Sequence, residues 1–269
     1  MGKDGAVRVL TWNLWWRYGP WQARRAAIAA TLAEVDPDIC GLQEVWGTDT
    51  ENFAAELAER LGRHWCWARA STGRDGVGIG NAVLSRWPIV ARVEQPLPTG
   101  EPIEARVALH AAVDAPGGVL PMFTTHLTYR PGGSAVRVQQ VRRLASFVAE
   151  HRADGGYPPV VTGDLNAEPD SDELRLLGGL LTVPAAPGLV LVDAWRFADP
   201  DDPGYTWDRR NGYQAATKLP NSRIDFILTG LPRPDDKRAQ VRSARLAGTE
   251  PVDGVWPSDH FAVVADLEP

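Results

Sequence analysis

Apolar stretches that end abruptly on polar side chains are the feature that most constrains this chain, and the clearest example lies at residues 159–169. Two consecutive valines there suit the core of a β-strand, and Gly163 allows another backbone or a ligand to approach closely. Asp164 and Asn166 follow two residues apart, so strand alternation would direct both side chains to the same side. The same pair is also frequent in turns, where Asp and Asn bond to their own backbone. By itself, the segment is compatible with both interpretations.

The same arrangement recurs beside other apolar stretches that are typical of strands. The further polar side chains are Asn13 after residues 7–10, Glu44 after 38–42, His126 after 119–123, Asp225 before 226–228, and Asp259 with His260 before 261–265. A phosphoester is an anion that repels hydroxide, so its hydrolysis needs groups that neutralise charge, position water and stabilise the leaving oxygen. The carboxylates, amides and imidazoles at these strand ends are the inventory of a divalent-metal phosphoesterase.

Seven short motifs, taken in chain order, resemble those of the endonuclease/exonuclease/phosphatase family. They are Thr-Trp-Asn at 11–13, Leu-Gln-Glu at 42–44, Gly-Asn-Ala-Val-Leu-Ser-Arg-Trp-Pro-Ile at 80–89, Thr-Thr-His-Leu at 124–127, Gly-Asp-Leu-Asn-Ala-Glu-Pro at 163–169, Ser-Arg-Ile-Asp-Phe at 222–226 and Ser-Asp-His-Phe at 258–261. Each motif is weak singly, but the ordered set covers essentially the whole chain. The family includes deoxyribonuclease I, abasic-site endonucleases, deadenylases, sphingomyelinases and inositol polyphosphate phosphatases.

The resemblance implies a four-layer αββα sandwich, in which two mixed β-sheets pack face to face and helices cover them. We expect one domain over residues 1–269. Periodicity alone predicts only a mixed α/β or α+β protein, because several strands follow one another directly and exclude a purely alternating parallel sheet. The expected helices are 21–35, 51–61, 135–151 and a short one within 170–180, with another short piece at 190–198; the expected strands include 7–14, 38–44, 77–85, 89–94, 104–113, 223–229, 240–247 and 259–267.

By the same resemblance, the reaction is Mg²⁺-dependent, with Mn²⁺ as a possible substitute. Glu44 is the expected principal metal ligand, and Asn13 and Asp259 are expected to hold the ion or its waters. Mg²⁺ prefers oxygen ligands and commonly keeps several waters, which fits one or two carboxylates and an amide.

The remaining strand-end residues are expected to act on water and phosphate. Asp164, steadied by Asn166, orients or deprotonates the attacking water, while Asp225 fixes and charges His260. His260 then contacts the phosphoryl oxygen or acts as the base, and the resemblance leaves both roles open. His126 stands where many relatives have a phosphate-contacting histidine; the abasic-site branch has tyrosine there, so we expect a different branch.

Composition narrows the expected partners. The net charge is −6, which argues against a broad cationic surface for long nucleic acid. We therefore favour a phosphodiesterase or phosphatase acting on a phosphoester substrate, either a small molecule or nucleic acid. A nuclease proper is the narrower alternative, and a catalytically silent binding module of the same fold is the third. No apolar run is long enough to span a bilayer and the N-terminus shows no signal-peptide segment, so we expect a cytoplasmic monomer.

Several other residues have structural interpretations. The pairs Arg24-Arg25, Arg142-Arg143 and Arg209-Arg210 are expected on solvated faces, Arg74 in solvent, His110 as a satisfied structural histidine, and Cys40 and Cys66 as buried thiols. The aromatic residues of loop 15–21 either pack against the next helix or contact substrate. Together with the long loop 199–222, that loop is the main candidate for substrate selection.

Overall fold

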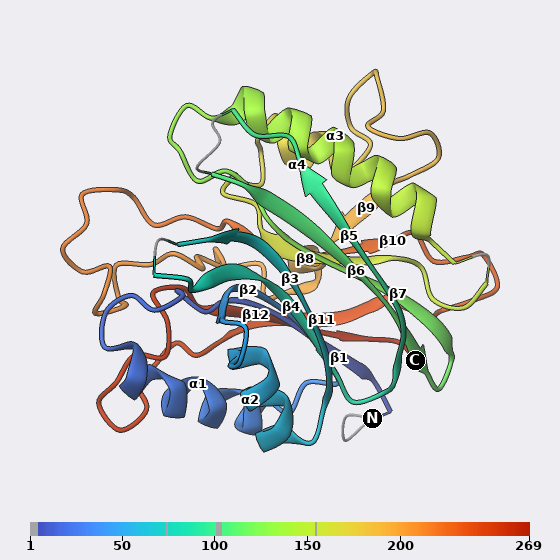
Figure 1. Ribbon diagram of the computed structural model, residues 1–269. Helices are drawn as coiled ribbons and strands as arrows, with labels where there is room; N and C mark the ends of the chain where they lie inside the picture. Colours follow the sequence, from blue (N-terminus) through green and yellow to red (C-terminus); the bar gives the residue numbers. More distant parts are fainter. Residues whose placement is uncertain (1–4, 74, 101–103, 154) are drawn as a thin grey trace.

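The computed structural model describes residues 5–73, 75–100, 104–153 and 155–269, and within these ranges two six-stranded β-sheets pack face to face (Figure 1). The first sheet has the order β11 (Val241–Ala247), β12 (Ala262–Leu267), β1 (Val7–Asn13), β2 (Ile39–Gly47), β4 (Gly78–Ser85) and β3 (His64–Thr72). The second has the order β5 (Ile89–Leu97), β6 (Arg106–Ala115), β7 (Gly118–His126), β8 (Val160–Asp164), β10 (Asp225–Gly230) and β9 (Leu191–Asp193). Each sheet mixes parallel and antiparallel neighbours.

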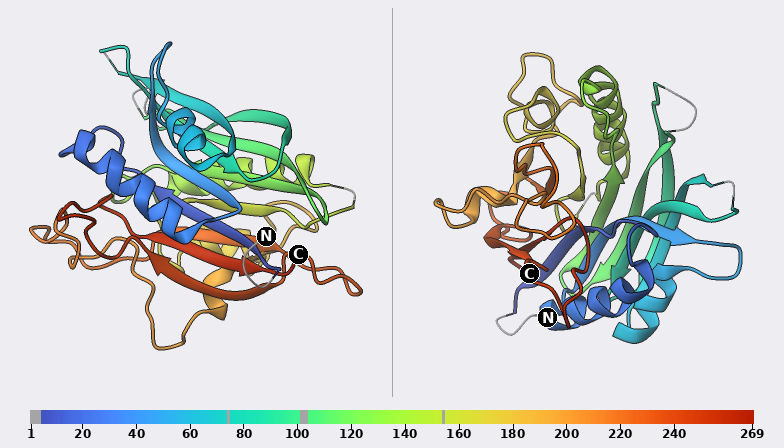
Figure 2. Two further views of the ribbon diagram at one scale, coloured as in Figure 1. Left: turned by 90° about the horizontal axis from the view of Figure 1, so that it is seen from below. Right: turned by 90° about the vertical axis from the view of Figure 1, so that its left-hand side faces the viewer.

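Helices cover the outer face of each sheet, which makes four layers (Figures 1 and 2). The helices α1 (Trp21–Val35) and α2 (Phe53–Leu61) cover the first sheet, and α3 (Ser134–His151) and α4 (Asp172–Leu177) cover the second. Val9 and Leu10 are consecutive in β1 but belong to different cores, one between the sheets and one under α1, because strand side chains alternate. The four-layer prediction is confirmed. Among the described helices, none combines the length and apolar character that a membrane crossing would need.

The strand directions bring the predicted polar residues to one end of the sandwich. β1 runs parallel to β2, and β7 runs parallel to β8, so Asn13, His126 and Asp164 end their strands on the same side, and Glu44 lies near them, three residues before the end of β2. β10 runs antiparallel to β8 with Asp225 opposite Asp164, so this strand begins where β8 ends. The same holds for β12, which is antiparallel to β1 and begins just after His260.

A buried polar network joins the two sheets beneath this end. The side-chain amide of Gln43 donates to Thr11 Oγ1 at 3.1 Å and, across the sheet interface, to Thr124 Oγ1 at 2.9 Å. The sheets approach so closely here that a Cβ on Gly41 would lie 2.0 Å from Thr162 Oγ1. Only glycine fits there, which explains the Gly-Leu-Gln-Glu sequence of β2.

Several element boundaries differ from the sequence prediction. Residues 190–198 form β9 followed by a 3₁₀ turn at Ala194–Phe197, rather than one helical piece. β10 and β12 begin later than expected, at Asp225 and Ala262 instead of residues 223 and 259. The two cysteines are buried and unbridged, as predicted. Arg74 lies outside the described residues.

His110 is buried as predicted, but it is not satisfied by hydrogen bonds. Its side chain is 5% exposed, its ring stacks on Phe123 at 4.6 Å, and neither ring nitrogen has a hydrogen-bond partner among the described residues. Burial, helped by nearby His151, lowers the pKa of His110 to about 4. The neutral imidazole therefore serves as an aromatic core side chain beneath α3.

This histidine is expected to make the fold acid-sensitive. The pKa of His110 is about 4 in the folded protein and 6.5 in the unfolded chain, so acid protonates the unfolded chain first. The stability that the neutral imidazole contributes is therefore present above pH 6.5 and is lost as the pH falls toward 4. The loss between pH 7.5 and 4.5 is expected to be about 2 to 3 kcal/mol. Urea unfolding at both pH values should show a smaller decrease for His110→Leu than for wild type. The exposed His64→Leu is the control and should behave like wild type; an unchanged pH dependence in His110→Leu would contradict this prediction.

Candidate active site

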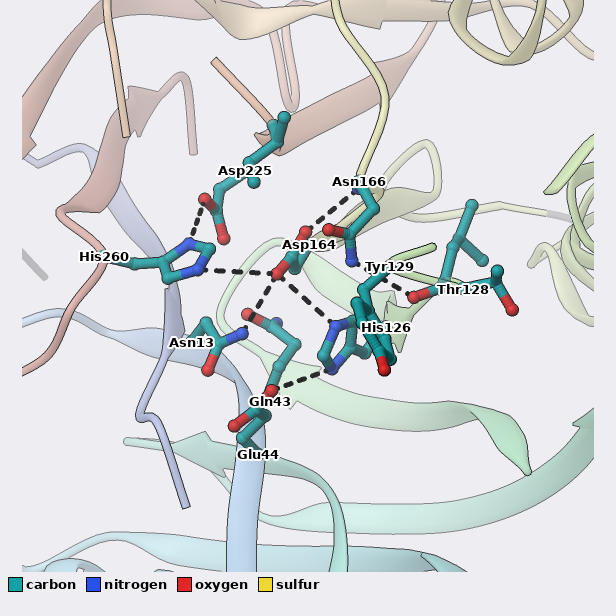
Figure 3. A network of polar contacts seen from close by, with 12 residues as sticks. Asn13, Gln43, Glu44, His126, Thr128, Tyr129, Asp164, Asn166, Asp225 and His260 are labelled. Carbon is teal, nitrogen blue, oxygen red and sulfur yellow. Dashed lines mark hydrogen bonds and ion pairs between the residues drawn. The ribbon is translucent and has the colours of Figure 1, made fainter. Parts of the chain in front are cut away.

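Three side chains from three different strands or loops converge on one oxygen, Oδ2 of Asp164 (Figure 3). Asn13 Nδ2 donates to it at 3.0 Å, His126 Nε2 lies 3.5 Å away and His260 Nε2 lies 3.9 Å away. Asp164 itself is buried. Burial, with the nearby charge of Asp225, raises the pKa of Asp164 to about 7. One carboxylate oxygen is thus the centre of the predicted constellation.

Asn166 contributes through its backbone, and the predicted strand alternation is wrong at this position. β8 ends at Asp164, and Asn166 has a left-handed backbone with φ of 48°. Its amide N–H donates to Oδ1 of Asp164 at 3.0 Å, and its side chain donates to the carbonyl of Leu127 at 3.2 Å. The turn interpretation of this pair therefore applies, and the turn itself orients the carboxylate.

Glu44 sits on a β-bulge and not at a strand end. β2 continues through it to Gly47, and its pairing with β4 shifts register between Leu42 and Val45. The bulge places Glu44 at φ of 52° and redirects its side chain, which is a common use of bulges next to functional sites. Glu44 Oε1 lies 3.8 Å from His126 Nδ1, while Oε2 is buried with no hydrogen-bond partner among the described residues. Burial raises the pKa of Glu44.

The two histidines of the site, His126 and His260, differ in charge state. Burial, together with the positive charge of Arg106, lowers the pKa of His126 well below its ordinary value, so this imidazole is neutral. Burial by itself would also lower the pKa of His260, but the charges of Asp225 and Asp259 outweigh it and raise that pKa well above the ordinary value. His260 Nδ1 lies 2.8 Å from Asp225 Oδ2 and donates to it. The pair is buried, so His260 is held as an imidazolium.

Asp259 lies in the same cavity but is tied to a different loop. Its Oδ2 accepts a hydrogen bond from Gln214 Nε2 at 2.9 Å, and burial raises its pKa to about 6. The hydroxyl of the preceding Ser258 donates to the backbone carbonyl of Asn13 at 2.6 Å. This bond joins the segment that carries Asp259 and His260 to the end of β1.

A cavity of about 650 Å³ opens over these groups and is lined by most of the predicted site residues. Asn13, Glu44, His126, Asp164, Asn166, Asp259 and His260 all reach it. Asp225 is not among its lining residues and lies behind His260 (Figure 3). The structure therefore brings together all eight residues that the sequence singled out.

Comparison with known proteins agrees with this geometry. The family model described as "Endonuclease/Exonuclease/phosphatase family" matches residues 10–260. This chain belongs to that family.

Proteins similar to this chain have low sequence identity to it. An uncharacterized protein of Caenorhabditis elegans, F14F9.5, is 23% identical, with 98% of this chain and 91% of that protein covered. The crystal structure of D. rerio TDP2 complexed with single strand DNA product has a TM-score of 0.76 at 21% identity, covering 98% of this chain and 99% of that chain. The mannosyl-6-phosphatase Bt3783 of Bacteroides thetaiotaomicron has a TM-score of 0.72 at 20% identity, with 97% and 99% covered. The two structural likenesses show that this chain has the fold of these proteins.

The carboxylates around the cavity fit a divalent cation, which the chemistry of the family requires. Glu44, Asp164 and Asp259 line one cavity, and burial raises the pKa of all three. Glu44 Oε2 and Asp225 Oδ1 are buried without hydrogen-bond partners among the described residues, so each has a free oxygen. Asp164, Asp225 and His260 also lie close enough together to hold a metal ion as a group. However, the hydrogen bond to Asp225 and the cationic state of His260 make this imidazole a poor ligand, so the oxygens around Glu44 fit a hard cation better.

Arg24 is buried and does not lie on a solvated face as predicted. It is 1% exposed and donates to the carbonyl oxygens of residues 14, 15, 16, 18 and 257 at 2.8 to 3.3 Å. Two of these residues, Trp15 and Trp16, have left-handed backbones, so the loop turns its carbonyls inward around the guanidinium. Arg24 thereby joins the loop after β1 to the segment that carries Asp259. Nothing in the local sequence, where Arg24 stands next to Arg25 on a predicted helix, indicates that its side chain joins these two segments.

Loss of this guanidinium is expected to destabilise the fold. Arg24→Met should lower the free energy of unfolding by about 3 to 5 kcal/mol, because buried carbonyls would lose a charged donor. Urea unfolding measures the effect. The neighbouring Arg25, which pairs with Glu56 near the surface, is the matched control, and Arg25→Met should cost about 1 kcal/mol or less. Equal losses in the two variants would show that Arg24 does not organise the loop.

Other supporting residues come from the loop 199–222. Thr206 Oγ1 accepts from the backbone N–H groups of Ile224 and Asp225 at 3.2 and 3.3 Å, and so fixes the start of β10. The Tyr-Thr-Trp sequence at 205–207 is the signal that points to this position. Gln214, which bonds to Asp259, has no such signal because its loop shows no periodicity.

Proposed function

We propose that this protein is a Mg²⁺-dependent hydrolase that cleaves a phosphoester, either a phosphodiester or a phosphomonoester, by attack of an activated water. The observation that carries the proposal is the convergence of Asn13, His126 and His260 on a single oxygen of Asp164. A buried carboxylate with a pKa of about 7 is suited to accept a proton near neutral pH. The family membership and fold support the same reaction class.

Each residue has a role that follows from its contacts. Asp164 orients or deprotonates the attacking water, and the backbone N–H of Asn166 holds its other oxygen. His260 is kept cationic by Asp225, so its Nε2–H can donate to a phosphoryl oxygen that gains charge during attack. His126 is neutral and offers a hydrogen bond to the phosphate without adding charge. The imidazolium role fits His260 better than the role of base.

The metal would be held by Glu44, with Asn13 and Asp259 positioned to hold it or its waters; Mn²⁺ is the expected substitute. When bound, Mg²⁺ neutralises phosphate charge and stabilises the leaving oxygen. Asn13 connects this region to Asp164 because its amide donates to the carboxylate. We also propose that the chain acts as a single-domain cytoplasmic monomer.

A nuclease is the second candidate, because one structural neighbour is described as complexed with single strand DNA product. Against it stands the net charge of −6. A catalytically silent module is disfavoured because every polar position predicted from the sequence is present in the cavity region.

Turnover of bis-p-nitrophenyl phosphate, with p-nitrophenyl phosphate as the monoester control, tests the proposal. We expect hydrolysis that requires Mg²⁺ or Mn²⁺ and stops on addition of a chelator. The Asp164→Asn variant, purified in parallel, excludes a contaminating phosphatase if its activity is lost. Absence of turnover with either metal between pH 5 and 9 would instead favour the silent binding module.

A further inference from the structure

The mouth of the active-site cavity is formed by an aromatic rim, which we define as Trp15, Tyr18, Tyr129, Trp207, Leu219 and Pro220. The same cavity has a polar floor that contains Glu44, His126, Asp164 and His260, and Figure 3 shows these side chains together with Tyr129 of the rim. Its members come from three separate loops, which follow β1, follow β7 and precede β10. The rim is therefore assembled by the fold.

The rim exposes large apolar side chains to solvent. Tyr18 is 51% exposed, Tyr129 is 60% exposed and Leu219 is 56% exposed, and all three line the same cavity. Scattered exposed apolar residues are ordinary, but a cluster around a concave site marks a surface that binds something. Aromatic side chains in particular offer a flat apolar surface to a ligand.

The rim is also held in place before any ligand binds. Trp15 packs on Tyr213 at a ring distance of 4.7 Å, and the guanidinium of Arg24, from helix α1, lies 4.8 Å from the centre of the Trp15 ring. Trp207 forms a two-way backbone bridge with Ser222, through hydrogen bonds of 3.0 and 2.9 Å. Ordering these rings on binding would therefore cost little entropy.

Positive charge is sparse around this cavity. Among the described residues, its lining includes no lysine or arginine, and the cationic group of its floor is His260. Arg106 faces a smaller neighbouring cavity and pairs with Glu104 at 3.1 Å, and Glu104 also pairs with Arg130 at 3.3 Å. Arg24 is committed to backbone carbonyls. Within the cavity lining, a second or third phosphate on the substrate would thus meet apolar side chains and no lysine or arginine.

We propose that the substrate carries one phosphate whose ester groups are each flat or large and apolar, so that the aromatic rim binds them while the polar floor holds the phosphate. This inference rests on the proposed phosphoesterase activity and adds the class of substrate. It predicts discrimination against substrates whose other parts are small and polar or are themselves phosphorylated.

Two p-nitrophenyl phosphodiesters with the same leaving group test the substrate class: phenyl p-nitrophenyl phosphate and methyl p-nitrophenyl phosphate. The corrected ratio is kcat/KM for the phenyl diester over that for the methyl diester, divided by the ratio of their rates of uncatalysed hydrolysis. We expect this corrected ratio to be about 10 to 100, since stacking on an aromatic side chain has an effect of this size. Trp207→Ala and Tyr129→Ala should each move the corrected ratio toward one. Trp65→Ala removes an exposed tryptophan outside the cavity and should leave the ratio unchanged.

Competition provides a second measurement that needs no variant. Phenyl phosphate should inhibit at least about 10-fold more strongly than fructose 1,6-bisphosphate, which has two phosphates and no apolar group. A corrected ratio near one in wild type, or stronger inhibition by the bisphosphate, would overturn the substrate class while leaving the phosphoesterase proposal intact. Hydrolysis of neither diester and of no p-nitrophenyl phosphate in the presence of Mg²⁺ or Mn²⁺ would overturn both.

Discussion

Asp164→Asn and His260→Ala are each expected to lower kcat by about 10³-fold or more, and the double variant is expected to be little worse than either single variant. The two side chains face each other, with Nε2 of His260 3.9 Å from Oδ2 of Asp164. If one orients the water while the other stabilises the phosphoryl oxygen, both act in the same transition state. Residues that act as a unit show strongly non-additive losses.

The measurement is a double-mutant cycle on kcat with bis-p-nitrophenyl phosphate at saturating Mg²⁺. Asp266→Asn and His151→Ala are matched controls because both residues lie away from the active site. Asp266 forms an ion pair with Arg8, and His151 lies at the end of α3. Both should retain activity near that of wild type. Circular dichroism must first show that all variants fold. Losses that multiply in the double variant would refute a shared step.

Glu44→Gln is expected to weaken Mg²⁺ binding at least about 10-fold and to lower turnover by about 10²- to 10³-fold, while the fold remains intact. The substitution keeps the shape of the side chain and removes its charge. Oε2 of Glu44 has no hydrogen-bond partner among the described residues, so the metal-free protein loses no such contact at that atom. Replacing an anionic ligand of a hard cation removes most of the local attraction for it.

Isothermal calorimetry with Mg²⁺ gives the affinity directly, and the shift of the melting temperature with added Mg²⁺ gives it independently, because a ligand stabilises only the state that binds it. Glu56→Gln is the control, as Glu56 lies on α2 and pairs with Arg25 and Arg60. Unchanged Mg²⁺ affinity in Glu44→Gln would rule out its role as the principal ligand and direct attention to the Asp164, Asp225 and His260 group.

The sequence alone was sufficient to identify the family and the strand ends that carry most of the candidate site residues. Apolar runs of strand periodicity locate Asn13, His126 and Asp164 at chain positions where a strand stops, and strand burial is a local property of alternating side chains. The helices at 21–35 and 135–151 were equally visible, because one helical face repeats every three to four residues.

Only the tertiary structure decided how these groups meet and what surrounds them. The contact between Asn13 and Asp164 spans 151 residues of sequence, and no local pattern reports on such a pair. The bulge at Glu44 arises from pairing with β4, so it redirects a side chain that alternation would have placed elsewhere. Arg24 looked like a surface residue because its charge suggested solvent, yet inside the protein it is satisfied by four backbone carbonyls of the loop before α1 and by the distant carbonyl of Pro257. Sequence periodicity records the burial of single elements, whereas the aromatic rim and its lack of cationic side chains depend on how separate loops pack together.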